Sequence, residues 1–171
     1  MSEALTPPFI VAALLLSVAG ALKLRSPQGT GEALRALVLP VGAWTVPALA
    51  AGEVALGAAC AIDPTRASAA VLAGAYAAFV GVAAALARRG SACGCFGADD
   101  TPVSAIHWIA SAGLGAVALG ATVAGPQGLG WVLGRPAPQV TALLIGIVGA
   151  VYAAVILYTA VPRAWTAWSG E

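Results

Sequence analysis

Charged residues are scarce in this chain. They make up 9% of its 171 residues, whereas hydrophobic residues make up 60%. A water-soluble domain of this length carries far more charge on its surface, so the composition excludes a soluble globular protein and indicates that the solvent is a bilayer. The eight lysines and arginines leave a formal net charge of +1. Because they form no basic patch, nucleic-acid binding is excluded as well.

Cysteine and histidine are also scarce, because the chain has only three cysteines and one histidine. Three cysteines cannot build a disulfide framework, so thiols in this chain point to redox or metal chemistry. The first apolar run follows Met1, Ser2 and Glu3 without a basic segment, and we therefore expect no cleavable signal peptide. No repeat of fixed period is present. The chain is expected to form one integral membrane domain over residues 1–171.

Long apolar runs, in contrast, are abundant. Five of them can cross a hydrocarbon core of about 30 Å as helices that rise about 1.5 Å per residue. A shorter amphipathic stretch between residues 26 and 43 predicts a helix that lies along the interface and ends near Pro40. The predicted fold is all-α, a polytopic membrane helix bundle with five transmembrane helices and one short interfacial helix. The predicted spans are residues 8–24, 44–62, 67–87, 103–124 and 139–161, with a thiol-bearing loop at residues 88–102.

The loop contains the sequence Cys93-Gly94-Cys95. Two cysteines separated by one glycine can form a disulfide or share a soft metal ion, because glycine has no Cβ to obstruct either arrangement. The ring closed by such a disulfide is small, so it is expected to be strained and easily reduced. This pattern favours a redox-active pair over a structural crosslink. The third cysteine, Cys60, is interpreted as a buried core residue near the opposite membrane face.

Several ionisable residues could serve the thiols. A thiolate is the attacking species in thiol-disulfide exchange, and a nearby cation or base is needed to favour it. His107, one turn inside the fourth span, could take this role or could simply be half-buried. Glu53 lies in the middle of the second span, where an unpaired carboxylate costs several kcal/mol. Lys23, at the end of the first span, could either snorkel to the headgroups or reach inward to pair with Glu53 in a polar pocket.

The arginines at the end of the third span, Arg88 and Arg89, are further candidates for this pocket. They also bear on topology. With five spans, one membrane side carries six basic residues, namely Lys23, Arg25, Arg35, Arg88, Arg89 and Arg163, and the other carries Arg66 and Arg135. The positive-inside rule therefore predicts a cytoplasmic thiol loop.

These motifs together resemble a known family. The stretch Ala19-Gly20-Ala21-Leu22-Lys23-Leu24-Arg25-Ser26-Pro27, the stretch Gly52-Glu53-Val54-Ala55-Leu56-Gly57, and Cys93-Gly94-Cys95-Phe96-Gly97 followed by Pro102 and His107 are similar to MauE-type methylamine utilisation proteins, within the DoxX-like group. The resemblance covers roughly residues 8–125. It implies a multi-pass protein of the bacterial plasma membrane that exchanges thiols and disulfides with a thioredoxin-fold partner. Cys93 and Cys95 would be the redox-active disulfide, and Lys23, Glu53 and His107 would be pocket residues.

Other functions remain open from the sequence. A quinone could accept electrons from the thiols, because a helix bundle offers an apolar pocket beside them. Alternatively, Cys93, Cys95 and His107 could bind Cu(I) or Zn(II) through thiolate and imidazole groups. The chain could also be a non-catalytic assembly subunit that packs its small-residue helices against other membrane subunits. In every case membrane lipids are its surroundings.

Overall fold

The computed structural model describes residues 2–91, 105–161, 164 and 168. All regular structure in these residues is helical, which confirms the predicted all-α bundle with five helices long and apolar enough to span a membrane. The helices are α1 (Ser2–Arg25), α2 (Gln28–Ala36), α3 (Thr45–Ile62), α4 (Arg66–Ala87), α5 (Ala105–Ala124), α6 (Leu129–Leu133) and α7 (Ala137–Thr159). The sequence did not predict α6, which lies in what looked like a linker. The predicted start of the fourth span at residues 103 and 104 lies outside the described residues.

The first span begins six residues earlier than predicted. Pro7 and Pro8 were taken as its start, but both lie inside α1. Proline lacks the N–H that would bond to the carbonyl four residues earlier, and those carbonyls belong to Glu3 and Ala4. Both residues are exposed at the end of the bundle. Water and headgroups can satisfy these carbonyls there, so the helix tolerates two prolines near its start.

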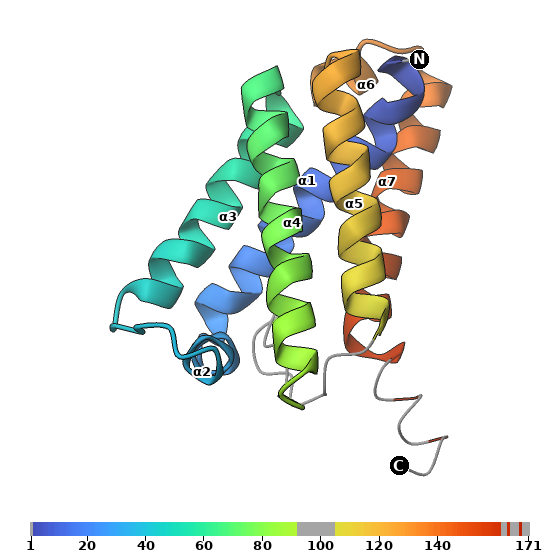
Figure 1. Cartoon of the computed structure of the whole chain (residues 1–171). Helices are drawn as coiled ribbons and strands as arrows, with labels where there is room; N and C mark the ends of the chain where they lie inside the picture. Colours follow the sequence, from blue (N-terminus) through green and yellow to red (C-terminus); the bar gives the residue numbers. More distant parts are fainter. Residues whose placement is uncertain (1, 92–104, 162–163, 165–167, 169–171) are drawn as a thin grey trace.

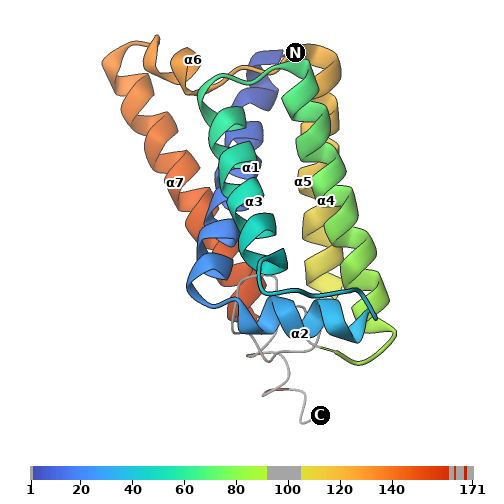
Figure 2. The ribbon, with the colours of Figure 1, turned by 90° about the vertical axis from the view of Figure 1, so that its left-hand side faces the viewer.

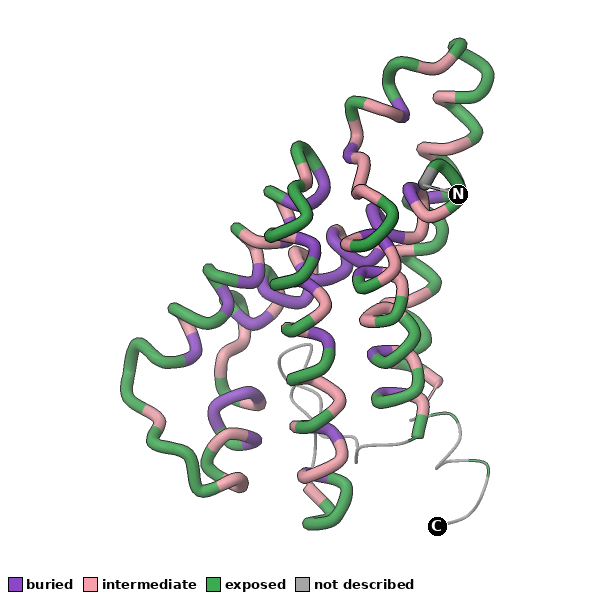
Figure 3. The backbone as a smooth tube through the Cα atoms, turned by 45° about the horizontal axis from the view of Figure 1, so that its top comes forward, coloured by how far each residue is buried: buried purple, intermediate pink, exposed green. Residues whose placement is uncertain are grey.

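α1 is the central helix of the bundle. It crosses behind α4 and α5, and it packs against α3, α5 and α7 (Figure 1). Half of its most apolar 18-residue window is buried, whereas only 6% of the corresponding window of α7 is buried. Buried residues accordingly concentrate along α1, and the outer faces of the surrounding helices are exposed (Figure 3). Those outer faces are apolar, as expected for surfaces that contact lipid tails.

The amphipathic helix α2 lies across one end of the bundle, roughly perpendicular to the spans (Figure 2). This arrangement agrees with the predicted interfacial helix, but the helix ends at Ala36 instead of near Pro40. Val38, two residues later, has a φ of 61°. This left-handed conformation is incompatible with a right-handed α-helix, so the helix cannot extend to Pro40. The same end carries the start of α3, the end of α4, the start of α5 and the end of α7 (Figure 2). We call it the α2 end.

The other end, where α6 and the N-terminus lie, contains the turn between α3 and α4 (Figure 1). The Thr65 side chain caps α4 by accepting a hydrogen bond from the Ser68 backbone N–H, and the Ser68 hydroxyl accepts one from the Thr65 N–H. This reciprocal cap explains why α4 begins at Arg66. Cys60 is fully buried nearby, and its thiol donates to the Ser68 carbonyl. It lies in the core towards this end, as the sequence indicated.

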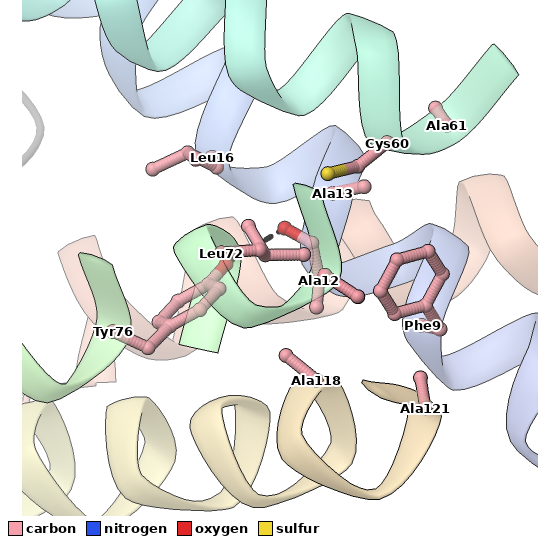
Figure 4. Packing of buried hydrophobic residues seen from close by; sticks show 11 residues of the cluster. Phe9, Ala12, Ala13, Leu16, Cys60, Ala61, Leu72, Tyr76, Ala118 and Ala121 are labelled. Atoms are coloured by element: carbon pink, nitrogen blue, oxygen red, sulfur yellow. Dashed lines mark hydrogen bonds between the residues drawn. The ribbon is translucent and has the colours of Figure 1, made fainter. Parts of the chain in front are cut away.

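Tyr76 links α4 to the central helix. Its hydroxyl donates a 2.7 Å hydrogen bond to the Ala12 carbonyl, within a core cluster that contains Phe9, Leu16 and Leu72 (Figure 4). Tyr76→Phe keeps the ring and removes only this bond. We expect it to lower the free energy of unfolding by about 1 kcal/mol.

The matched control for this variant is Tyr152→Phe on α7, because the Tyr152 side chain is 68% exposed. Its stability should stay within about 0.5 kcal/mol of the parent. Denaturation of both variants in the same detergent measures the difference. Equal stability of the two would contradict the buried position of the Tyr76 hydroxyl.

Candidate functional site

Lys23 and Glu53 form a buried ion pair between α1 and α3. The Lys23 Nζ atom donates to both carboxylate oxygens of Glu53, at 2.5 Å and 2.7 Å. The side chains are 4% and 6% exposed. Lys23 therefore does not snorkel, whereas Arg25, two residues later, is exposed. The two charges neutralise each other at short range, which is the condition under which buried charges are tolerated.

Close contact between α1 and α3 makes this pair possible. A Cβ at Gly20 would lie 2.6 Å from the Ala50 carbonyl oxygen and 3.0 Å from the Glu53 Cβ. Only a glycine lets the α3 backbone approach α1 this closely, one helical turn before Lys23.

A small cavity adjoins the ion pair at the centre of four helices. Its volume is about 30 Å³, which is above the minimum that a buried water requires. Lys23 of α1, His107 and Ser111 of α5, and Tyr158 of α7 supply its polar groups. The Lys23 Nζ atom also lies 4.9 Å from the centre of the Phe79 ring, a cation-π contact from α4. The apolar part of the lining is Leu15, Leu16, Ala19, Ala83 and the rings of Tyr76 and Phe79.

His107 is buried and packs against α7. Its ring meets the Tyr158 ring edge to face, with 5.7 Å between the ring centres. The Tyr158 and Ser111 hydroxyls are hydrogen-bonded at 3.0 Å. His107 is thus held by its surroundings, and it faces the same cavity as Lys23. Of the three pocket residues that the family resemblance implies, Lys23 and His107 line this cavity, and Glu53 is paired with Lys23.

The two arginines are not part of this cavity. Arg88 and Arg89 are exposed beyond the end of α4, and neither lines it. Arg89 instead donates a hydrogen bond from its Nη1 atom to the Ala36 carbonyl, at the end of α2. Their interpretation as pocket residues is not supported by this arrangement. Because Lys23 is neutralised by Glu53, the positive-inside count for the thiol side depends on its other five basic residues, of which Arg163 lies outside the described part of the chain.

Cys93 and Cys95 lie outside the described residues. The described segments that flank them, Ser91 after α4 and Ala105 at the start of α5, are both at the α2 end (Figure 1). His107 is the third residue of α5 and belongs to the same end. Among the described residues no group of three His, Cys, Asp or Glu side chains could hold a metal ion. The set Cys93, Cys95 and His107 stays a prediction from the sequence.

Ser111 and Tyr158 were not among the site residues predicted from the sequence. Ser111 follows His107 by four residues, so the two share a helix face, and this spacing could have indicated a polar site on α5. Tyr158 had no such signal, because tyrosines near the end of a span are typical of interfaces. It turns inward because α7 ends beside His107 and offers its hydroxyl to Ser111.

The cavity combines two electrostatic features. One is the Lys23 ammonium group, which lines the cavity while its partner Glu53 does not. An imidazole beside it can gain or lose a proton near neutral pH. Such a site can favour an anion and exchange a proton, and it lies at the end of the bundle where α4 and α5 are joined through residues 92–104.

Comparison with known proteins addresses the identity of this bundle. The family model described as "Methylamine utilisation protein MauE" matches residues 3–126, which cover α1 to α5 and leave α6 and α7 outside. No curated protein matches the chain. No solved structure matches it either. Because the match covers most of the chain, including Lys23, Glu53 and His107, the protein belongs to the MauE family of methylamine utilisation proteins and is a multi-pass protein of the bacterial cell membrane.

Proposed function

We propose that the protein is a membrane thiol-disulfide oxidoreductase that exchanges electrons between Cys93-Cys95 and a thioredoxin-fold partner. The observation that carries this proposal is that Lys23, which is paired with Glu53, and His107 line one cavity at the end of the bundle where the helices flanking the thiol segment lie. An ammonium group and an imidazole are the groups that favour a thiolate.

Electrons and protons are balanced between the protein and its partner in this exchange. A thiolate of the reduced partner attacks one sulfur of the Cys93-Cys95 disulfide, and a mixed disulfide forms while the other sulfur leaves as a thiolate. The second partner thiolate then attacks the mixed disulfide. The partner becomes the disulfide, and Cys93 and Cys95 receive two electrons and two protons. The reverse direction uses the same steps.

The described residues have separate roles in this proposal. His107 accepts the proton of an attacking thiol and returns it to the leaving thiolate. Lys23 favours the thiolate through its positive charge, and Glu53 holds the Lys23 ammonium in place. Ser111 and Tyr158 position the imidazole, because Tyr158 packs on its ring and is itself hydrogen-bonded to Ser111.

The exchange needs no quinone, because the electrons pass between the two proteins. A quinone that reoxidises the thiols stays a prediction from the sequence.

Trapping of mixed disulfides tests the proposal. Cys95→Ser leaves a single thiolate at Cys93, which attacks the disulfide of an oxidised thioredoxin-fold partner and displaces one partner thiolate. Position 95 then has no thiol to resolve the mixed disulfide, so a covalent complex should accumulate, and Cys93→Ser/Cys95→Ser should form none. Cys60→Ser is the matched control, because Cys60 is buried in the core far from the α2 end. A normal redox state of the partner in cells that carry the double variant would rule the proposal out.

Two further measurements separate the competing functions. Stoichiometric Cu or Zn in the purified, reduced protein that is lost in the double variant would favour metal handling instead. Alkylation of the thiols from each side of intact cells identifies the membrane face that carries them, which the charge pattern predicts to be cytoplasmic.

A further inference from the structure

The end of the bundle opposite α2 contains an amphipathic groove that the proposed function does not use. Its polar part is a hollow of about 640 Å³ bordered by Glu3, Trp131, Arg135 and Gln139. Its apolar part is a hollow of about 330 Å³ between α1, α5 and α7, bordered by Pro8, Val11, Leu114 and Gly146 among others. Both hollows are lined by Ala142 and Leu143, so they meet on α7.

The two hollows follow the same pair of helices. The α1 residues that line them recur at positions 3, 4, 7, 8 and 11, and the α7 residues at 139, 142, 143, 146, 147 and 150. Both series have the spacing of a single helix face. The groove therefore begins among charged residues at the end of the bundle and continues along apolar side chains into the membrane-spanning part. This polarity matches the orientation of a phospholipid, with its headgroup at the interface and its acyl chain in the hydrocarbon core.

Two opposite charges stand side by side in the polar hollow. The Arg135 Nη2 atom lies 2.7 Å from the Glu3 Oε1 atom. The guanidinium carbon lies 4.2 Å above the centre of the Trp131 ring, so cation-π stacking fixes the orientation of Arg135. The arginine is 31% exposed and the glutamate 64% exposed, so both can contact a further molecule. A guanidinium has five N–H donors in a fork that suits phosphate oxygens, and Glu3 uses few of them.

Trp131 offers a second observation. Its indole N–H is buried and has no hydrogen-bond partner among the described residues. The Glu3 carboxylate interacts with this N–H but does not meet the geometry of a hydrogen bond. Buried donors without a partner are rare in folded proteins, and they usually indicate a bound water or ligand.

We propose that this groove is a binding site for phosphatidylethanolamine. The phosphate binds Arg135, the primary ammonium binds Glu3, and one acyl chain lies along the apolar hollow between α1 and α7. The assignment follows from charge complementarity. The hollow carries one positive and one negative group, so a headgroup with one of each is matched, whereas an anionic headgroup such as that of phosphatidylglycerol brings no partner for Glu3. The quaternary ammonium of phosphatidylcholine has no N–H to donate to a carboxylate.

Native mass spectrometry of the purified full-length protein tests the site. The protein is delipidated in detergent and titrated separately with phosphatidylethanolamine, phosphatidylglycerol and phosphatidylcholine of identical acyl chains. We expect the first bound phosphatidylethanolamine to have about tenfold higher affinity than either other lipid, the ratio expected for one added charged hydrogen bond. Equal retention of all three lipids, or no retention of any, would overturn the proposal, as would a second copy of the chain in place of lipid.

Two charge variants divide the recognition between its parts. Glu3→Gln should remove the preference for phosphatidylethanolamine over phosphatidylglycerol and keep binding of both. Arg135→Gln should weaken all three lipids, because each carries a phosphate. Matched controls are Arg66→Gln, an exposed arginine at the same end, and Glu32→Gln on α2, and both should bind like the parent. If Glu3→Gln changed the retention of all three lipids by the same factor, or if Arg135→Gln changed none, the residues would not recognise the headgroup and the proposal would fail.

A third variant fills the apolar hollow. Gly146 lines it, and a Cβ at this position would meet nothing within 4 Å. Gly146→Leu should fold normally and lower retention of every lipid severalfold, with the headgroup preference unchanged. Gly149→Leu, three residues later, also has open space around it but does not line the hollow, and it should retain lipid like the parent. These measurements involve no thiol, so their outcome does not depend on whether the protein exchanges electrons.

Discussion

Lys23→Met is expected to lower the free energy of unfolding by about 3–5 kcal/mol, because it leaves the Glu53 carboxylate buried without its counter-ion. Both Lys23 Nζ contacts, at 2.5 Å and 2.7 Å, are lost while Glu53 stays 6% exposed. Glu53→Met should lower the free energy of unfolding by a similar amount, since it leaves the Lys23 ammonium group buried without its counter-ion. Unfolding in a mixed-detergent titration, followed by circular dichroism, measures both variants.

The double variant Lys23→Met/Glu53→Met separates charge from packing. It removes both charges and keeps similar volumes, so most of the lost stability should return. Arg25→Met is the control, because Arg25 is exposed two residues after Lys23, and its stability should change by less than about 0.5 kcal/mol. A double variant as unstable as the single variants would mean that the side chains matter for their shape and not for their charge.

The same double variant also tests the proposed chemistry. With the fold restored, the cavity lacks its ammonium group but keeps His107, Ser111 and Tyr158. If Lys23 favours the thiolate, mixed-disulfide formation should slow markedly in this variant although its helices are intact. Unchanged kinetics would confine the ion pair to a structural role and leave the thiols to other groups.

Gly57→Leu is expected to prevent the assembly of α1 with α3. A Cβ at Gly57 would collide with the Ser17 hydroxyl and the Ala13 carbonyl oxygen and would lie 2.9 Å from the Ser17 backbone nitrogen. Backbone atoms of a packed helix cannot move aside as a flexible side chain can, so even Gly57→Ala should cost about 1–3 kcal/mol, and the leucine variant more. Detergent-solubilised Gly57→Leu should aggregate or elute early in size-exclusion chromatography.

Gly52 provides the control on the same helix. A Cβ there would meet nothing within 4 Å, and the residue is exposed. Gly52→Leu should therefore fold like the parent or slightly better, because glycine costs about 1 kcal/mol in a helix interior. Equal disruption by both substitutions would show that α3 packs through a different face than the one described.

Helix boundaries were predicted well where apolar runs end in punctuation. The span predicted at residues 44–62 is α3 (Thr45–Ile62), and the span predicted at 67–87 is α4 (Arg66–Ala87). Helix boundaries were predicted wrongly where proline and glycine suggested a break that the structure does not have. Pro7 and Pro8 normally mark a helix start, yet they lie inside α1, and the glycine-rich and proline-rich stretch before α7 contains the short helix α6.

The candidate site was predicted in part. An isolated carboxylate in an apolar run is expensive, so Glu53 was noticed, and pairing with Lys23 was one of two alternatives for that lysine. The choice between snorkelling and pairing depends on how near α3 comes to α1, and Gly20 controls this distance through contacts with Ala50 and Glu53 that no local pattern reveals. Arg88 and Arg89 looked equivalent to Lys23 by position, but the end of α4 leaves them exposed.

A five-span membrane bundle with a Cys-Gly-Cys segment can be predicted from local properties alone, because hydropathy and cysteine spacing do not depend on distant neighbours. The shared cavity of Lys23, His107, Ser111 and Tyr158 cannot be predicted in this way. These residues lie on α1, α5 and α7, and which face of each helix turns inward depends on the packing of the others. Contacts between distant segments are collective, so they exist only once the whole bundle has assembled.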